Sequence, residues 1–141
     1  MAVARPIELP TVGELLWLHE ALSERLGWEE EVRELAALEL ALVLLYREAE
    51  TSPRQSRAMQ VARCGAVLVR GLLEYRPFRQ GNAATAWMAL VRFLEANGFE
   101  LAASENASSR MLSALIRGRK DMEAFRSWLL RRLRSRPARA F

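Results

Sequence analysis

The sequence contains very few of the residues that build cross-links and metal sites. Its 141 residues include a single cysteine, Cys64, a single histidine, His19, and a single lysine, Lys120. One cysteine can form neither an intramolecular disulfide nor a cysteine-based zinc site, so we expect no disulfide within the chain. We also predict no metal-binding residues. Seven glycines and five prolines are too few for a collagen-like or low-complexity chain.

Long apolar runs are also missing. The longest, from Leu35 to Tyr46, is interrupted by Glu39 and is too short to cross a bilayer. Arg5 is not followed by the apolar segment of a signal peptide. Because 51% of the residues are hydrophobic and 27% are charged, the composition suits one folded domain with a buried core. These features predict a soluble, cytoplasmic domain that does not bind a membrane.

The net charge of +4 conceals two parts of opposite sign. Residues 1–50 carry four arginines and eleven glutamates, whereas residues 51–141 carry seventeen basic and six acidic residues. The basic side chains near the C-terminus favour contact with nucleic acid or an acidic partner, and the alternative is an ordinary solvated face. The residues predicted to form this polyanion surface are Arg117, Arg119, Lys120, Arg131, Arg132 and Arg134.

Helical periodicity dominates the sequence, and no segment alternates for long enough to predict a strand. Thr11 is placed to cap the first helix, and Gly27 is placed to end it. The second helix is apolar nearly all round, which predicts a buried position; the second or the third helix is expected at the centre of the fold. We therefore predict an all-α domain, a single compact bundle of about six helices over residues 1–134, and a basic, disordered tail at 135–141. The predicted helices cover about 12–26, 29–47, 53–75, 82–97, 104–118 and 121–134.

The loop between the third and fourth helices has the most distinctive sequence, YRPFRQGNAATA in one-letter code. A Gly-Asn pair at a helix start leaves backbone N–H groups unpaired, and such groups favour anions. Arg76 and Arg79, together with Gly81 and Asn82, are therefore candidate anion-binding residues. The alternative is that Arg76 pairs with a carboxylate, such as Glu74 or one from the acidic N-terminal part.

This loop resembles the signature of the Fic/Doc (Fido) family, H-P-F-x-[D/E]-G-N-[G/K]-R, which is commonly followed by T-A and, about a dozen residues later, by N-G. The chain has R-P-F-R-Q-G-N-A-A-T-A, and Asn97-Gly98 follows. Leu18-His19 with Leu26-Gly27 resembles the start of short Doc-type (death-on-curing) proteins, and the stretch from Leu101 to Leu133 resembles their C-terminal helices. The resemblance covers nearly the whole chain and implies a Fido-like fold.

Four positions that carry chemistry in the family are changed. The family's general base is replaced by Arg76, and a guanidinium that stays protonated cannot accept a proton. Its Mg²⁺-binding acid is replaced by Gln80, and its phosphate-contacting residues by Ala83 and Ala84. The resemblance therefore implies a pseudoenzyme, with no catalytic residue and no cofactor expected. The alternative is a residual or altered nucleotidyl or phosphoryl transferase (AMPylation or Doc-type protein phosphorylation), which would use ATP and Mg²⁺.

The resemblance also implies a mode of action. Short Doc-type toxins of bacteria are neutralised by a partner helix that docks over the active-site cleft. We therefore expect macromolecular binding in a toxin–antitoxin-like context, with a protein partner whose helix docks over the 76–82 cleft. A basic nucleic-acid-binding module is the second alternative, and a homo-oligomer is compatible with the sequence.

Three further features are interpreted as structural. His19 is expected to be a half-buried residue that hydrogen-bonds a neighbour, rather than a base brought in from the first helix. Cys64 is expected to be a small buried apolar residue. Residues 48–53 lie where the family carries a flap that aligns a target segment, and here they are expected to form a plain surface turn.

Overall fold

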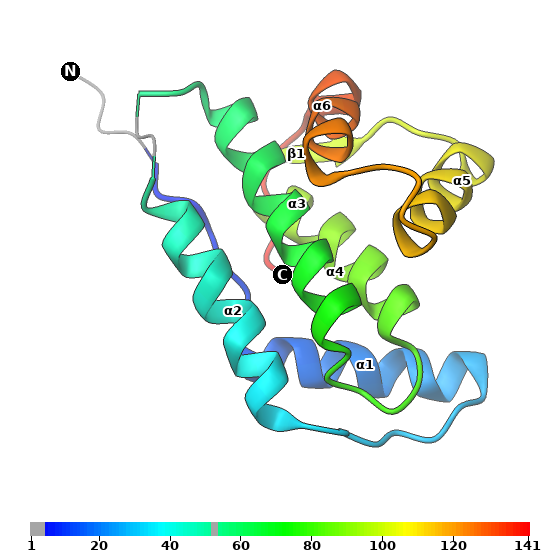
Figure 1. The fold of residues 1–141 in the computed structure, drawn as a ribbon. Coiled ribbons are helices and arrows are strands. Elements are labelled where there is room, and N and C mark those ends of the chain that lie inside the picture. Colours follow the sequence, from blue (N-terminus) through cyan, green and yellow to red (C-terminus); the bar gives the residue numbers. More distant parts are fainter. Residues whose placement is uncertain (1–4, 52–53) are drawn as a thin grey trace.

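The computed structural model describes residues 5–51 and 54–141 (Figure 1). The predicted all-α class is confirmed: the described chain forms six helices and one two-stranded sheet. The elements are α1 (Val12–Leu26), α2 (Leu35–Ala49), α3 (Arg57–Tyr75), α4 (Asn82–Ala96), β1 (Phe99–Leu101), α5 (Glu105–Ile116), α6 (Met122–Arg132) and β2 (Leu133–Ser135).

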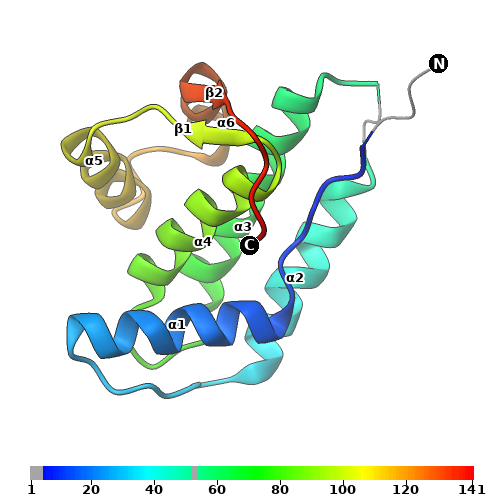
Figure 2. The ribbon, with the colours of Figure 1, turned by 180° about the vertical axis from the view of Figure 1, so that it is seen from behind.

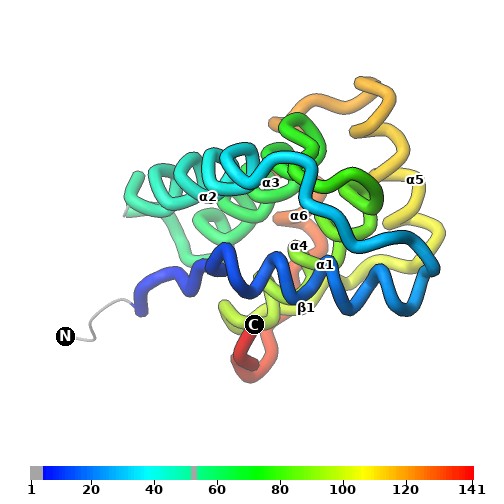
Figure 3. The backbone as a smooth tube through the Cα atoms, turned by 90° about the horizontal axis from the view of Figure 1, so that it is seen from below, coloured from blue at the N-terminus to red at the C-terminus, as the bar shows by residue number. Residues whose placement is uncertain are grey.

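The bundle is organised around α3, which packs against α2, α4 and α6 (Figure 1). Its Leu68 and Leu72 are fully buried. The helices α2 and α3 approach closely at Gly71, where an added Cβ would lie 2.9 Å from the Cβ of Ala41. Seen from below, α1 runs across the end of the bundle (Figure 3). The third helix is therefore the central one, as one of the two sequence-based alternatives predicted.

The second helix lies at the edge of the bundle, with α3 on its inner side (Figures 1 and 2). Its inner residues Leu38, Leu42 and Leu45 are at most 2% exposed. Its outer residues Leu40 and Val43 are each 44% exposed. The prediction of a fully buried second helix is therefore wrong, because an apolar face on every side does not guarantee a neighbour on every side.

The second helix also begins six residues later than predicted, at Leu35 instead of Glu29. The residues before it run along the loop that follows α3. The backbone N–H groups of Arg33 and Glu34 donate to the Pro77 carbonyl at 2.8 and 3.0 Å. These long-range hydrogen bonds override the local helix preference of the three consecutive glutamates that start at Glu29.

A small antiparallel sheet joins two segments in which no strand was predicted. Phe99 pairs with Ser135, and Leu101 pairs with Leu133. Each strand has three residues, which is too short for an alternating pattern to be recognised. Helix α6 ends at Arg132 because the next residue turns into this sheet.

The C-terminal segment 135–141, which was predicted to be a disordered tail, instead lies against the folded domain. Arg136 N–H donates to the Gly98 carbonyl at 2.9 Å, and Arg139 N–H donates to the Glu95 carbonyl at 3.0 Å. The ring of Phe141 lies 5.6 Å from the Arg92 guanidinium. The predicted boundary at residue 134 therefore falls inside β2, and backbone pairing holds the segment against the end of α4 (Figure 2).

The helix caps predicted from the sequence at Thr11, Gly27 and Ser104 are confirmed. Thr11 and Glu14 form a capping box at the start of α1, and Gly27 ends that helix in the left-handed conformation, with φ of 82°. Ser104 caps α5. The expected start of the third helix at Pro53 lies outside the described residues, and the described helix follows Ser56, whose side chain accepts the Met59 N–H.

Candidate functional site

The loop between α3 and α4 is closed on itself by Asn82. The side-chain Oδ1 of Asn82 accepts the Phe78 N–H at 3.0 Å, and its Nδ2 donates to the Phe78 carbonyl at 2.8 Å. Phe78 is 1% exposed, so this clasp lies in a buried environment. Arg76 occupies the turn out of α3 in the left-handed conformation, with φ of 46°. The side chain of Asn82 is thus used within the loop and is not presented to a ligand.

His19 supports the same loop from α1. Its ring stacks on Phe78 with centroids 3.8 Å apart and planes 5° apart. Its Nε2 lies 2.8 Å from the Gln80 carbonyl oxygen, which can only accept, so Nε2 carries the proton and donates. The prediction of a structural histidine that hydrogen-bonds a neighbour is confirmed, although His19 is 1% exposed and not half-buried.

Residues 28–34 cover the loop from outside, a role that the sequence analysis missed. A Cβ on Gly81, where φ is 80°, would lie 2.3 Å from the Trp28 ring, so only glycine fits beneath this indole. Arg33 donates to the carbonyls of Arg76 and Tyr75, both at 2.7 Å, and thereby caps the C-terminal end of α3. No local sequence signal marks these contacts, because the two segments are more than forty residues apart.

The charged side chains of the loop differ in their partners. Arg79 pairs with Glu31 of the acidic N-terminal part at 3.5 Å. Glu74 pairs with Arg70 at 3.0 Å, so it is not the partner of Arg76. Arg76 is exposed and forms no ion pair with any residue that the structure describes.

The loop borders a surface hollow of about 430 Å³, which we call the Ala83 hollow. It brings together all the candidate anion-binding residues and three of the four changed signature positions. Apolar side chains from α3 and α5 complete it. Its lining is Leu73, Glu74, Arg76, Arg79, Gln80, Gly81, Asn82, Ala83, Leu115 and Ile116.

A second hollow of about 310 Å³ lies on the other side of the first turn of α4, and we call it the Ala84 hollow. It is lined mainly by apolar side chains of α1, α4 and α5. The fourth changed signature position, Ala84, lies here. The residues that form it are Leu22, Arg25, Leu26, Ala84, Trp87, Met88, Ser108, Ser109 and Leu112.

A third hollow of about 490 Å³ lies between α5 and α6, and we call it the basic hollow. Lys120, Arg131 and Arg132 of the predicted polyanion surface line it, together with Arg110, which the sequence analysis missed because it precedes the C-terminal basic run. No carboxylate lines it. The remaining lining residues are Ala107, Met111, Ala114, Ala124, Ser127 and Trp128.

The rest of the predicted polyanion surface lies elsewhere. Arg134 is in β2 and pairs with Glu100 at 3.4 Å. Arg117 and Arg119 are exposed beyond the end of α5 and do not line the basic hollow. Arg132 stacks on the Trp128 ring, with its guanidinium carbon 4.5 Å from the ring centroid. Three of the six predicted residues therefore line one hollow, and the other three lie outside its lining.

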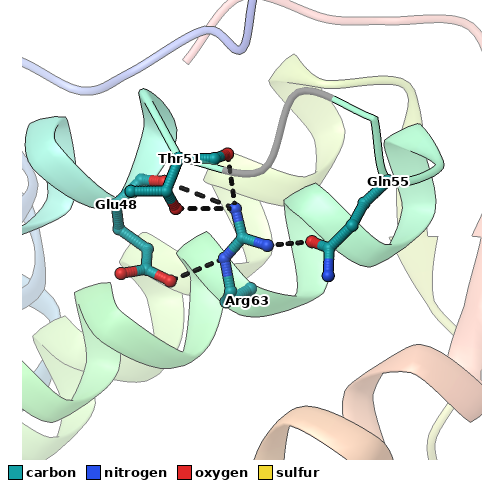
Figure 4. Close-up of polar contacts among 4 residues, drawn as sticks. All are labelled: Glu48, Thr51, Gln55 and Arg63. Atoms are coloured by element: carbon teal, nitrogen blue, oxygen red, sulfur yellow. Dashed lines mark hydrogen bonds and ion pairs between the residues drawn. The ribbon is translucent and has the colours of Figure 1, made fainter.

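The turn after α2 is tied to α3 by Arg63 (Figure 4). The Arg63 guanidinium lies 2.6 Å from the Glu48 carboxylate and donates to the Thr51 carbonyl at 2.9 Å. It also donates to the side chain of Gln55. Residues 48–51 thus form a compact polar turn, and residues 52–53 lie outside the described part of the chain.

Cys64, next to this turn, is fully buried. Burial raises the pKa of its thiol to about 11, against its usual value near 9. Because the thiolate is the reactive form, Cys64 is an inert core residue, as the sequence predicted.

The described residues hold no group of three or more His, Cys, Asp or Glu side chains suited to a metal ion. None of the described helices combines the length and apolar character needed to cross a membrane. No protein-family model matches the chain, and no curated protein matches it at significant similarity. The features that bear on function are therefore the geometry of the three hollows and the resemblance of the loop.

Proposed function

We propose that this protein is a catalytically degenerate Doc/Fic-like protein that acts by binding an amphipathic helix of a protein partner over the Ala83 and Ala84 hollows. One observation supports this proposal most directly. Leu26 and Ile116 are 58% and 57% exposed, the highest values among the large apolar side chains described, and each lines one of the two hollows. Exposed apolar residues that border neighbouring hollows are typical of helix-in-groove recognition.

The first turn of α4 provides the floor of this surface. Ala83 and Ala84 are partly exposed and small, so they leave room for apolar side chains of a docked helix. The same positions carry phosphate-contacting residues in the family, and alanine provides neither charge nor a side-chain donor. The substitutions that remove the phosphate contacts are thus compatible with a helix-binding surface.

The charges around the two hollows favour an acidic partner. Arg25 borders the Ala84 hollow, and Arg76 borders the Ala83 hollow. Neither forms an ion pair within the described chain, so both guanidinium groups are available to carboxylates. An amphipathic helix with leucines on one face and glutamates along its edges fits this surface. By the resemblance, the context is similar to that of a toxin–antitoxin pair.

A synthetic peptide tests the proposal directly. The probe is a labelled helix of about 20 residues with leucines at helical spacing and glutamates on both flanks, and its control is the same composition in scrambled order. We expect binding with a dissociation constant on the order of 10–100 µM by fluorescence anisotropy. The variants Leu26→Glu and Ile116→Glu should abolish it, whereas Met59→Glu on the exposed surface of α3 should not. Equal binding of the scrambled peptide, or no effect of either variant, would overturn the proposal.

Calorimetric titration with ATP, with and without Mg²⁺, separates this function from the transferase alternative. We expect no detectable binding at millimolar ATP, because the Asn82 side chain is engaged with Phe78, Arg79 is paired, and Gln80 carries no charge. Micromolar, Mg²⁺-dependent binding that is lost in Arg76→Ala would instead support a transferase.

The basic hollow supports a second candidate function, the binding of nucleic acid. Four cationic side chains converge there without a carboxylate, an arrangement that favours phosphates. A labelled single-stranded oligonucleotide should bind with an affinity that falls steeply with salt. Arg110→Ala and Arg131→Ala should each reduce the slope of log K against log salt by about 0.7. The control Arg134→Ala, outside the hollow, should change it less, and equal effects of all three would indicate only diffuse attraction.

A further inference from the structure

Within residues 5–51 and 54–141, no segment covers the outer face of α2. Leu35, Leu40 and Val43 are 47%, 44% and 44% exposed. The opposite face of the helix packs on α3. In both side views α2 forms one edge of the molecule, and α5 lies at the other edge (Figures 1 and 2). An apolar helix face of this kind is usually covered by another chain.

The exposed residues are spaced like an interhelical seam. Ala36, Leu40, Val43 and Arg47 are exposed and follow one another at steps of four, three and four residues. Residues at these steps lie on one side of an α-helix. The apolar part of the face is therefore a continuous stripe and not a set of scattered side chains.

Two charges on this face are arranged symmetrically about Val43. Glu39 precedes it by four residues and Arg47 follows it by four, so each lies about 6 Å along the helix axis from Val43. Both side chains are exposed, and neither forms an ion pair among the described residues. A helix that crosses this face in the opposite direction would meet complementary charges if it carried the same sequence.

We infer that α2 pairs with α2 of a second copy of this chain, antiparallel, across a twofold axis that passes near Val43. Glu39 of each copy then lies level with Arg47 of the other, and the Leu40 and Val43 side chains of both copies meet between them. A parallel pairing would instead place like charges opposite each other. The twofold pairing uses the same surface on both copies and forms a closed dimer.

The size of the surface predicts a weak dimer. A helix of 15 residues is about 22 Å long, and one helix pair buries less area than a standard interface. We therefore expect a dissociation constant on the order of 10 µM, visible as a concentration-dependent mass. Because no residue of α2 lines either alanine hollow, and the proposed axis passes near the middle of α2, the dimer surface is separate from the proposed helix-binding surface.

Sedimentation of the full chain between about 1 and 300 µM tests the dimer. Val43→Glu places two carboxylates at the axis and should yield a monomer at every concentration. Glu39→Arg alone should weaken the dimer at least tenfold, and the charge swap Glu39→Arg/Arg47→Glu should restore most of the affinity. Met59→Glu, a similarly exposed apolar position on α3, serves as the control.

A symmetric cross-link provides a second test. In a Cys64→Ala background, Val43→Cys should form an intermolecular disulfide rapidly under mild oxidation, because the two new thiols face each other at the axis. The control Met59→Cys should cross-link slowly. A wild-type chain that is monomeric at 300 µM, or a dimer that Val43→Glu leaves intact, would overturn the inference; the first result would leave the face to a different partner.

Discussion

Replacing Asn82 with alanine tests whether the 76–82 loop is held by its own side-chain clasp. Asn82 forms two hydrogen bonds with the backbone of Phe78, one as acceptor and one as donor. Both residues are buried, at 9% and 1% exposure. Alanine would remove both bonds and would leave the Phe78 N–H and carbonyl groups without partners.

The expected cost follows from these two groups. A buried backbone group that loses its partner costs about 1–3 kcal/mol, so the loss of both partners should cost about 2–6 kcal/mol. For a domain of this size, that corresponds to a decrease in melting temperature of about 6–18 °C. Alanine is a better helix former than asparagine, so we expect no additional loss of stability from helix propensity at the start of α4.

The assay is urea and thermal unfolding followed by circular dichroism at 222 nm. Gln80→Ala is the matched control, because the Gln80 side chain is exposed and only its backbone carbonyl binds His19. It should change the free energy of unfolding by no more than about 0.5 kcal/mol. If Asn82→Ala costs less than about 1 kcal/mol, or no more than Gln80→Ala, the loop does not depend on this clasp.

Three further predictions concern the core and the signature positions. The raised pKa of Cys64, about 11, predicts at least a hundredfold slower alkylation of native than of unfolded protein at pH 8, and faster reaction would contradict its burial. Because the unfolded thiol ionises first, stability should also fall as pH rises from about 9 to 11, less steeply in Cys64→Ala. Gly71→Ala should lower the free energy of unfolding by about 1–3 kcal/mol, and adding Ala41→Gly should restore part of it. Gly13→Ala is the control: an added Cβ there meets only one atom within 4 Å, so the substitution should stabilise the protein slightly. Equal effects of Gly71→Ala and Gly13→Ala would argue against the close α2–α3 contact. The last prediction concerns a variant that restores the four signature side chains together: Arg76→His, Gln80→Asp, Ala83→Lys and Ala84→Arg. Its melting temperature should stay within about 3 °C of the wild-type value. If the Fido resemblance is correct, the variant should also bind ATP measurably.

The parts of the fold that the sequence predicted are those determined by neighbours in the chain. Thr11 with Glu14 and the left-handed Gly27 bound α1 because capping involves residues only a few positions apart. The start of α2 could not be found in this way, because it depends on hydrogen bonds between Arg33 and Pro77. The pairing of Phe99 with Ser135 joins segments that carry no strand pattern of their own.

The sequence indicated the loop that borders the Ala83 hollow, but it did not indicate which residues from other elements line that hollow. The structure places Arg76, Arg79, Gly81 and Asn82 around this one hollow. The exposure of Leu26 and Ile116 could not be recognised from the sequence, because an apolar residue at a helix end has the same pattern whether a neighbour covers it or not. Arg110 of α5 lines the basic hollow together with residues of α6, and no local sequence pattern indicates that these residues share one hollow.

The family pattern in the loop separates into positions that hold the loop and positions that do not. Phe78 and Gly81, which match the pattern, lie against His19 and Trp28, and Asn82 clasps Phe78. The four positions that depart from the pattern have side chains that are exposed or partly exposed and line the two alanine hollows. Changes at the second group alter surface chemistry without touching the contacts that hold the loop. Substitutions at these four positions should therefore have little effect on stability, which is the physical basis for proposing a pseudoenzyme that retains its loop.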